Sequence, residues 1–587
     1  MTVDHVLDEF SAQRSEAAIC DRVIRAYRTI REHHRPEVWI TLREEDEVLA
    51  EARTIAVRVA TGETLPLAGL LVAVKDNIDI AGIPTTCACP DFATTPTHTA
   101  PAVARLIEQG ALILGKTNLD QFATGLVGTR SPYGAVRNSI APERVSGGSS
   151  SGSAVAVALG MVDAAVGTDT AGSGRVPAAL NGIVGIKPTR GLVSTTGVVP
   201  ACVDYDTVTV FARDLPLATI VARAMIGADP GDPRSRSWPV DAPQAAPPHA
   251  TIAVPTEHNL TALTPAYRAA FHATVERWRE RGGRIETIDV TELLDAAKLL
   301  YDGALVAQRY AAVGEFVRSH PDGTDPVVAR IINAAAQPPA YRYSEDLDRL
   351  AHATAAARRI FENCSALLLP TTTEHPTIAE VAAEPVSINR RMGTFTNFCN
   401  LLDLAAVAVP GVETTSGDPF GVMLITPAFA DQVGIDLAAE LLGEPAPPPL
   451  TDQGTDLLVV GAHLRGLPLH HQLVRASARY LGEVTTSDAY RMVELAAAPP
   501  KPGLLRVGPG AGRALPGELY RLSPAALGSF LNDLPAPMAL GKVELSSGRW
   551  VTGFACDYES AGNATDITSY GGWRRYLAAT TGTGLHG

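Results

Sequence analysis

The chain has 587 residues, of which 46% are hydrophobic, with a formal net charge of −14 at pH 7 and a pI near 5.5. At about 150 residues per domain, this length predicts two to four domains, and the apolar content excludes wholesale disorder. Nucleic-acid backbones and anionic membranes bind to basic surfaces, so the acidic charge excludes both as general partners.

The sequence carries no signal for export or membrane insertion. No apolar run reaches the roughly 18 residues of a membrane span. The N-terminal residues, with Asp4, Asp8 and Glu9, lack the apolar stretch of a signal peptide. The cysteines are scattered without a CxxC pair, and Cys87 and Cys89 have no further ligands at metal-binding spacing. We therefore expect a soluble, cytoplasmic protein with no metal and no other cofactor.

Along the chain, a helical segment comes first, and strands then alternate with helices. Apolar residues recur at helical spacing in residues 17–31 and 43–59, which predicts a helical segment over residues 1–60. Short apolar runs that predict strands follow at residues 69–74, 111–114, 164–167, 250–255, 366–369 and 404–409. Their alternation with helical stretches predicts an α/β fold, with a buried mixed sheet flanked by helices, over residues 61–445.

Two proline-rich segments interrupt these patterns. Residues 443–454 hold four prolines within five positions, which fixes the backbone and removes hydrogen-bond donors. We therefore expect a linker at residues 446–456 and a separate domain over residues 457–587. Residues 230–248 are also rich in proline. Because strand and helix patterns resume after them, we assign these residues to a loop of the large domain.

Two short motifs match known patterns but lack the required context. Residues 110–117 fit the Walker A pattern, yet the four spacer residues, Ala-Leu-Ile-Leu, indicate a buried strand instead of an open phosphate-binding loop. Residues 148–152 fit the nucleophile-elbow pattern around Ser150, yet no strand precedes them. We therefore predict neither a nucleotide site nor an elbow nucleophile here.

The strongest signal is a pair of glycine- and serine-rich turns at residues 147–153 and 167–177. Ser149 in the first turn and Ser173 in the second are 24 residues apart and bracket a helix and a strand. Each turn alone is explained by helix capping, which serine and glycine favour. Upstream, Lys75 lies in an apolar strand, where burial favours the neutral, basic form of a lysine.

Together these blocks resemble the amidase signature family, and the resemblance covers residues 45–440. It implies that Ser173 is the nucleophile, that Ser149, which follows a cis peptide bond in the family, relays the proton, and that Lys75 is the base. These roles are chemically sensible because a serine hydroxyl needs an adjacent base. The resemblance also implies an oxyanion hole formed by the backbone amides of Thr170, Ala171, Gly172 and Ser173, with Asp169 and Arg175 holding the turn.

Two further features are similar to allophanate hydrolases. Residues 120–134 look like the corresponding segment of those enzymes, which implies that Gly125 lines the substrate pocket. Tyr301 and Arg309 are eight residues apart in a helical pattern over residues 296–316, so about 80° separates them around one helix. The resemblance implies that this pair binds the substrate carboxylate. Without it, an exposed arginine and a half-buried tyrosine on an amphipathic helix would explain the pattern.

Residues 457–587 resemble the additional domain of the longer allophanate hydrolases, in blocks at residues 458–469, 517–520 and 566–573. The resemblance implies a small α+β domain of the γ-glutamyl-cyclotransferase-like barrel type. In the family, this domain is proposed to assist decarboxylation of N-carboxycarbamate or to mediate assembly. His463 is the candidate base there, and a structural histidine bonded to the backbone is the alternative.

The combined resemblance implies hydrolysis of allophanate (urea-1-carboxylate) to ammonia and carbon dioxide, in urea or cyanuric acid degradation. It also implies a homodimer or higher homo-oligomer, with residues 1–60 as a candidate interface, and a complex with enzymes of the same pathway. Three alternatives stay open: a general aliphatic amidase, a catalytically dead scaffold and a glutamine amidotransferase subunit. Neither amidase alternative requires Arg309, and the intact Lys75, Ser149 and Ser173 argue against a scaffold.

Overall fold

The computed structural model describes residues 15–496 and 500–581, and the chain divides into two units. The first unit comprises the chain up to Ser237 together with His249–Leu450. The second comprises Trp238–Pro248 together with the chain from Thr451 onward. The division after Leu450 lies inside the proline-rich segment. Residues 1–14 of the predicted N-terminal helical segment lie outside the described residues.

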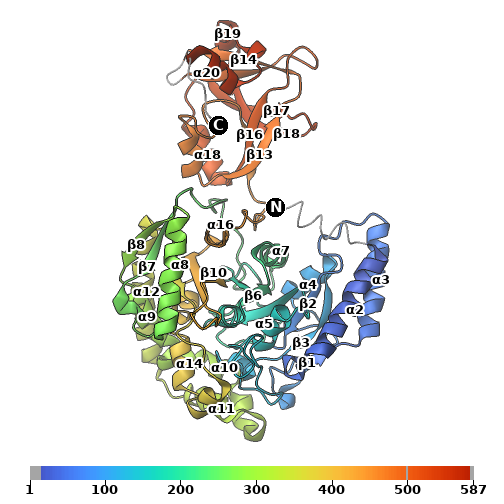
Figure 1. Cartoon of the computed structure of the whole chain (residues 1–587), viewed down its shortest axis with the longest axis vertical. Helices are drawn as coiled ribbons and strands as arrows, with labels where there is room; N and C mark the ends of the chain where they lie inside the picture. Colours follow the sequence, from blue (N-terminus) through green and yellow to red (C-terminus); the bar gives the residue numbers. More distant parts are fainter. Residues whose placement is uncertain (1–14, 497–499, 582–587) are drawn as a thin grey trace. The chain divides into compact units, whose positions relative to one another are not determined.

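The first unit is built on an 11-stranded mixed sheet (Figure 1). In spatial order the strands are β1 (Trp39–Leu42), β3 (Leu112–Thr117), β2 (Leu71–Lys75), β4 (Ala164–Asp169), β6 (Thr207–Ala212), β5 (Val184–Lys187), β10 (Leu404–Pro410), β11 (Gly421–Pro427), β9 (Ala366–Pro370), β7 (Thr251–Pro255) and β8 (Arg284–Ile288). β2, β3 and β4 form one parallel group and β7, β8 and β9 another, whereas the strands between them pair antiparallel. Every apolar run that predicted a strand lies in this sheet, which confirms the α/β fold.

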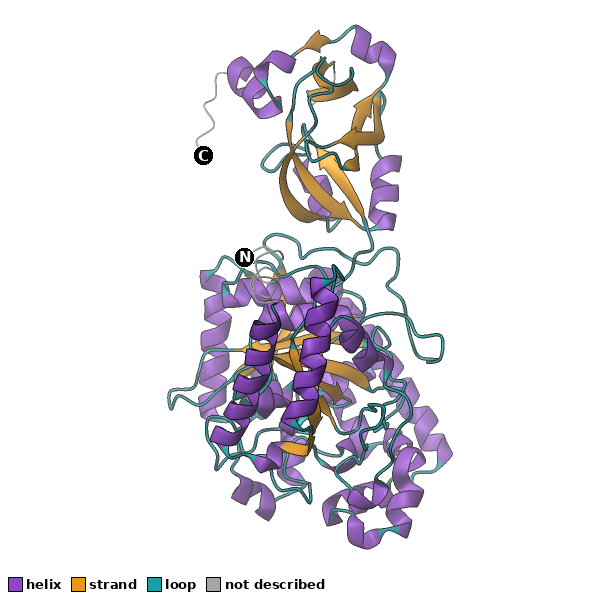
Figure 2. Ribbon diagram, turned by 90° about the vertical axis from the view of Figure 1, so that its right-hand side faces the viewer, coloured by secondary structure: helices purple, strands orange, loops and turns teal. Residues whose placement is uncertain are grey.

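Helices surround the strands of this unit (Figure 2). They are α2 (Glu16–His33), α3 (Glu45–Ala60), α4 (Pro101–Glu108), α5 (Ser151–Ala158), α6 (Val176–Leu180), α7 (Leu215–Met225), α8 (Pro265–Glu280), α9 (Thr291–Asp302), α10 (Ala307–Ser319), α11 (Pro326–Ala334), α12 (Ala340–Asn363), α13 (Ile378–Ala383), α14 (Ser387–Met392), α15 (Asn397–Leu401) and α16 (Asp431–Leu442). Local chemistry sets their ends: Thr264 caps α8 by accepting a hydrogen bond from the amide of Tyr267, and Pro265 is its first residue. None of the described helices is long and apolar enough to cross a membrane.

The second unit has its own sheets and its own core. A five-stranded sheet has the order β13 (Arg479–Thr485), β16 (Pro516–Leu522), β12 (Thr455–Val459), β18 (Trp550–Cys556) and β17 (Met538–Glu544). A three-stranded sheet consists of β15 (Lys501–Arg506), β14 (Tyr490–Leu495) and β19 (Thr565–Asp566). The helices are α17 (His470–Arg475), α18 (Pro524–Asn532), α19 (Tyr558–Gly562) and α20 (Trp573–Thr581). A buried cluster that includes Leu458, Tyr520, Phe554 and Trp573 holds them together, so the expected separate C-terminal domain with strands and helices is confirmed.

One segment of the second unit comes from the middle of the sequence. Within Trp238–Pro248, which we call the strap, the carbonyl of Val240 accepts a hydrogen bond from the amide of Ala525. The amide of Gln244 donates to the carbonyl of Ser477, and the carbonyl of Gln244 accepts from Arg479. The sequence patterns placed all of residues 230–248 in a loop of the large domain. The strap instead pairs with the second unit, because its backbone groups find their partners there.

Candidate active site

Lys75 ends β2, a strand with five buried residues between the parallel strands β3 and β4. Its Nζ atom lies 2.8 Å from Ser149 Oγ and 2.7 Å from Thr168 Oγ1. Burial lowers the pKa of Lys75 from 10.5 to about 7, and the nearby carboxylates of Asp120, Asp169 and Asp206 oppose this shift. Lys75 can therefore be a neutral base near neutral pH, hydrogen-bonded to a serine hydroxyl.

Ser149 lies just before α5, in the first glycine- and serine-rich turn, and the Gly148–Ser149 peptide bond is cis. The carbonyl of Ser149 accepts a hydrogen bond from the amide of Asp120, at 3.1 Å. Only glycine fits at position 148, because a Cβ atom there would lie 2.1 Å from Asp120 Oδ2. The turn thus brings Ser149 to Lys75, as the resemblance implied.

Ser173 lies in the turn that follows β4 and is 2% exposed. Asp169 closes this turn, because its carboxylate accepts hydrogen bonds from the amides of Gly172 and Gly174, each at 2.9 Å. Gly172 has a φ of +138°, and a Cβ atom there would lie 2.4 Å from Thr396 Oγ1. Both the backbone conformation and the close approach therefore require glycine at this position.

The oxyanion-hole prediction needs one correction. We expected the amide of Gly172 among the donors, but it already donates to Asp169 Oδ1. The carboxylate at the start of the turn competes for the same N–H group, which the sequence pattern does not show. The amides of Thr170, Ala171 and Ser173 donate to no other described residue. These three amides are the remaining candidates for stabilising a developing negative charge.

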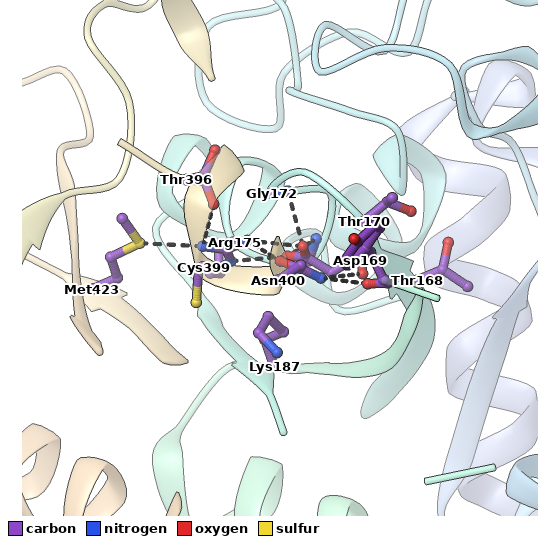
Figure 3. A network of polar contacts seen from close by, with 12 residues as sticks. Thr168, Asp169, Thr170, Gly172, Arg175, Lys187, Thr396, Cys399, Asn400 and Met423 are labelled. Atoms are coloured by element: carbon purple, nitrogen blue, oxygen red, sulfur yellow. Dashed lines mark hydrogen bonds and ion pairs between the residues drawn. The ribbon is translucent and has the colours of Figure 1, made fainter. Parts of the chain in front are cut away.

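A buried ion pair fixes the Ser173 turn (Figure 3). Arg175 donates from Nε and Nη2 to the carboxylate of Asp169, at 3.0 and 2.9 Å, and both side chains are fully buried. Burial alone would raise the pKa of Asp169, but the Arg175 guanidinium holds it below its ordinary value. The resemblance implied that these residues hold the turn, and their contacts agree with that role.

Three residues that sequence analysis did not single out also hold the active-site turns in place: Thr168, Thr396 and Asn400. Arg175 also donates to the carbonyl of Thr396 and to Asn400 Oδ1, and the Asn400 amide donates to the carbonyl of Asp169, at 2.7 Å (Figure 3). Thr168 receives hydrogen bonds from both Lys75 and Asn77. Thr168 lies in β4, the parallel neighbour of β2, so a strand-by-strand alignment of the sheet would have pointed to it.

Tyr301 and Arg309 meet, but not on one continuous helix as predicted. α9 ends at Asp302, Gly303 is extended, and a short 3-10 helix at Ala304–Val306 leads into α10. The carboxylate of Asp346 causes the break, because it accepts a hydrogen bond from the amide of Ala304 and leaves no space for a side chain at Gly303. Arg309 Nη2 still lies 3.3 Å from Tyr301 Oη, and the guanidinium lies 5.2 Å from the centre of the tyrosine ring.

Arg309 is a buried cation. Its side chain is 1% exposed, and it forms no ion pair with a carboxylate among the described residues. Nη1 donates to Thr124 Oγ1, at 3.0 Å, and to the carbonyl of Ala123, whereas Nε has no partner. Because an unpaired buried charge is costly, this guanidinium is suited to an anionic ligand. Tyr301 is half-buried, as in the alternative interpretation, but Arg309 is buried where that interpretation had an exposed arginine.

Gly125 follows the residue that binds Arg309. It is buried, and a Cβ atom there would lie 2.5 Å from Asp120 Oδ2, so its immediate constraint is the packing of Asp120. A cavity of about 540 Å³ is lined by Tyr301, Thr394 and Asn397, among other residues. With its amide nitrogen facing the Ser173 turn, Asn397 donates to the carbonyl of Ala171, at 2.8 Å. The cavity lining therefore includes Tyr301, the partner of Arg309, and Asn397, which contacts the Ser173 turn.

The segments that fit the Walker A and nucleophile-elbow patterns have structural roles. Residues 112–117 form β3, and Lys116 makes a fully buried ion pair with Asp76, at 3.0 Å. Ser150 is the N-cap residue of α5, and its hydroxyl donates to the carbonyl of Thr168. Within the described parts of the chain, no group of three or more His, Cys, Asp or Glu side chains could hold a metal ion.

His463 lies in the second unit, in the loop after β12. Nε2 is 2.8 Å from Gln472 Oε1, and the ring stacks on Phe554, with centroids 4.9 Å apart. Burial lowers the pKa of His463, so the imidazole is neutral at pH 7. It lines a cavity of about 260 Å³ with Lys501 and Phe530. The expected alternative, a hydrogen bond to the backbone, is not what holds this ring.

Two family models match the chain. The model described as amidase matches residues 22–433, and the model described as allophanate hydrolase C-terminal domain matches residues 455–578. The first match covers the Lys75, Ser149 and Ser173 region and extends to Arg309, whereas the second begins at β12. Apart from the strap, which lies within the first match, the two matches fall on different units of the structure.

Several known proteins are similar to this chain. It is 42% identical over 571 residues to urea amidolyase from Saccharomyces cerevisiae, covering 92% of this chain and 31% of that protein. It is 34% identical over 426 residues to a glutamyl-tRNA(Gln) amidotransferase subunit from Deinococcus deserti, covering 67% of this chain and 87% of that protein. The solved allophanate hydrolase of Kluyveromyces lactis matches with a TM-score of 0.85 at 36% identity and covers 99% of both chains. The chain spans about a third of the length of the urea amidolyases that it matches.

Proposed function

Because the chain belongs to the amidase family and its second unit matches the allophanate hydrolase C-terminal domain, we propose that it hydrolyses allophanate to ammonia and carbon dioxide. The observation that carries the choice of substrate is Arg309, a buried guanidinium beside Tyr301 that forms no ion pair with a carboxylate among the described residues. Allophanate is a small, planar anion with a carboxylate for this guanidinium and a terminal amide for a nucleophile. The net charge of −14 gives no long-range attraction for an anion, so binding depends on this local charge.

In the proposed reaction, Ser173 Oγ attacks the terminal amide carbonyl while its proton passes through Ser149 to neutral Lys75. The amides of Thr170, Ala171 and Ser173 stabilise the oxyanion, and Gly125 contributes to the pocket wall. The proton then returns through Ser149 to the leaving nitrogen, and ammonia departs. Water activated by the same residues hydrolyses the acyl-enzyme, which restores Ser173 and releases N-carboxycarbamate.

The role of the second unit is part of the proposal. N-carboxycarbamate must lose carbon dioxide and be hydrolysed to yield the second ammonia, and the second unit assists this decarboxylation or mediates assembly. The neutral imidazole of His463, in its small cavity, supports a role as a base. We also propose a cytoplasmic homodimer or higher homo-oligomer. The longer urea amidolyases that the chain matches support a partnership with the enzyme that supplies allophanate.

A substrate panel tests the proposal. Ammonia release is measured from allophanate, malonamate, glutamine and a neutral aliphatic amide, with the wild type and Arg309→Ala. We expect Arg309→Ala to lower kcat/KM for the two substrates with a free carboxylate next to the amide by about 100-fold or more, because the carboxylate loses the buried guanidinium that binds it. Turnover of the neutral amide should change by less than about threefold. Good turnover of neutral amides without turnover of allophanate would refute the substrate assignment and favour a general amidase.

A glutamine-dependent activity is the second outcome to examine. The match to an amidotransferase subunit covers 67% of this chain, and glutaminase activity that appears only with a partner protein would favour that function. A chain that hydrolyses none of the four substrates and does not react with a serine-directed probe would instead be a scaffold.

A further inference from the structure

Asp120 is a buried carboxylate that contacts the Ser149 turn. Its side chain is fully buried, and it forms no ion pair among the described residues. Backbone amides hold it instead: Oδ2 accepts from Val127, at 3.2 Å, and Gly128, at 3.0 Å, and Oδ1 accepts from Arg130, at 3.0 Å. Three backbone N–H groups therefore face this carboxylate and fix its position.

The position of Asp120 is tied to the Ser149 turn. Its amide donates to the carbonyl of Ser149, at 3.1 Å, and its carboxylate packs directly on Gly148 and Gly125. A Cβ atom would approach Asp120 Oδ2 to 2.1 Å from position 148 and to 2.5 Å from position 125. Glycine at these two positions therefore gives the carboxylate its place against the cis peptide of Ser149.

Three buried carboxylates act on Lys75, but their charges are not equivalent. Asp169 is paired with Arg175, so its charge is neutralised locally. Burial raises the pKa of Asp206, and its carboxylate accepts hydrogen bonds from the hydroxyl of Thr170 and the amides of Ala201 and Cys202. Asp120 exerts the largest of the charge effects that oppose burial at Lys75, and it has no cationic partner of its own among the described residues. Of these three carboxylates, Asp120 therefore contributes most to stabilising the protonated form of Lys75.

From this geometry we propose that Asp120 is a positioning residue of the active site. Its carboxylate fixes the Ser149 turn and provides the negative charge that sets how readily Lys75 gives up its proton. This inference rests on the proposed role of Lys75 as the base. It assigns a second function to the segment after β3, which otherwise serves to hold Arg309 through Thr124.

The test measures the rate at which a fluorophosphonate probe labels Ser173 between pH 5 and pH 9, with the full-length chain. For the wild type, the rate should rise with pH around a midpoint of about 7, where Lys75 becomes neutral. In Asp120→Asn, the loss of the negative charge favours neutral Lys75, so the midpoint should fall by about 0.5 to 1 pH unit. Because the Ser149 turn is also less well held, the plateau rate should fall about tenfold.

A matched control variant distinguishes a shift of the midpoint from a general loss of activity caused by a disturbed structure. Asp431 is another fully buried aspartate, bound to the amide and hydroxyl of Thr189, at 2.7 and 2.6 Å, and it is not among the charges acting on Lys75. Asp431→Asn should keep the wild-type midpoint. A folded Asp120→Asn variant with an unchanged midpoint would overturn the proposal, because a purely structural residue would lower the rate equally at every pH.

Two further results keep the test decisive. If Asp120→Asn does not fold, Gly125→Ala replaces it, because the added methyl group must displace the Asp120 carboxylate. A folded Gly125→Ala variant with the wild-type midpoint would overturn the proposal in the same way. The probe does not depend on the identity of the substrate, so a wrong assignment of allophanate leaves the result interpretable. A wild-type chain that the probe does not label would refute both this proposal and the proposed function.

Discussion

The two units differ in whether their buried charged groups are fully paired. In the first unit, Lys75 and Arg309 are fully buried, and neither forms an ion pair with a carboxylate among the described residues. In the second unit, the buried carboxylate of Glu518 is fully satisfied: it accepts from the amide of Arg465 and the hydroxyl of Tyr520, each at 2.9 Å, and from Arg574, at 3.0 Å.

This difference separates groups that are available for chemistry from groups that stabilise a fold. A buried charge without a partner costs stability, so it persists where a substrate or a proton transfer makes use of it. Asp169 and Arg175 lie in the first unit but belong to the second class, since each satisfies the other. The comparison therefore predicts which substitutions change activity and which change stability.

The largest expected effect is the loss of activity in Ser173→Ala. We expect ammonia release from allophanate to fall by at least about 1,000-fold, because no other hydroxyl replaces the nucleophile. Ser150→Ala is the matched control, since Ser150 is the N-cap of α5 and should lower activity less than about tenfold. Steady-state assays of both variants check this prediction. A larger loss in Ser150→Ala than in Ser173→Ala would restore the nucleophile-elbow interpretation.

Removing one partner of the Asp169–Arg175 pair should mainly lower stability. Arg175→Met leaves a buried carboxylate without its cation, which costs about 3–5 kcal/mol. In the second unit, Arg574→Met removes a side chain that is 41% exposed, and the buried Glu518 keeps its hydrogen bonds from Arg465 and Tyr520, so the cost should be lower, about 1 kcal/mol. Calorimetric unfolding transitions of the two variants measure the difference. Equal destabilisation would show that burial does not distinguish these two ion pairs.

The pH dependence of activity should follow Lys75. Because burial lowers its pKa to about 7 and the neutral amine is the base, kcat/KM should increase about tenfold from pH 6 to pH 8. The rate therefore falls as the pH drops below 7 and Lys75 becomes protonated. A profile of kcat/KM against pH checks this, and a rate that is constant down to pH 5 would contradict a lysine base.

Thr124 should affect carboxylated substrates only. Thr124→Val keeps the shape of the side chain but removes the hydroxyl that accepts from Arg309 Nη1, so the guanidinium is less well oriented. We expect KM for allophanate to rise about fivefold, in line with the loss of one hydrogen bond to a charged group. Thr124→Ser keeps the hydroxyl and should restore the wild-type KM. An equal effect on a neutral amide would indicate a general disturbance of the pocket.

The smallest expected effect concerns His463. Because this residue lies in the second unit, His463→Asn should change the release of the first ammonia by less than about twofold. Release of the second ammonia should slow if His463 assists decarboxylation. Following both ammonia molecules in a single turnover distinguishes the two steps. If neither step changes in a folded variant, the histidine serves only to pack against Phe554.

Sequence patterns predicted the elements of the first unit well where local signals are strong. The apolar runs around Lys75 and Asp169 indicated buried strands, and the spacing of glycine and serine indicated the two turns. Contacts between segments distant in sequence were not predictable in this way. The break at Gly303 depends on the carboxylate of Asp346, and the amide of Gly172 is occupied because the side chain of Asp169 turns back on it.

The same reasoning explains what was missed elsewhere. Thr396 and Asn400 contribute through contacts with Arg175, more than 200 positions away in the chain, so no local pattern reveals them. The sequence of the strap has no helical or strand periodicity, because proline lacks a backbone N–H group and interrupts regular hydrogen-bond patterns. Its attachment to the second unit became visible only through its hydrogen bonds.

The strap also sets an order of events during synthesis of the chain. Gln244 leaves the ribosome 235 residues before Arg479, the side chain that donates to its carbonyl. At typical rates of translation, this interval is about 10 to 50 s, far longer than a strand needs to pair. During that time the strap lacks its partners in the second unit, while residues 249–450 of the first unit are synthesised. The second unit is therefore completed when it binds a segment that was synthesised long before its own strands.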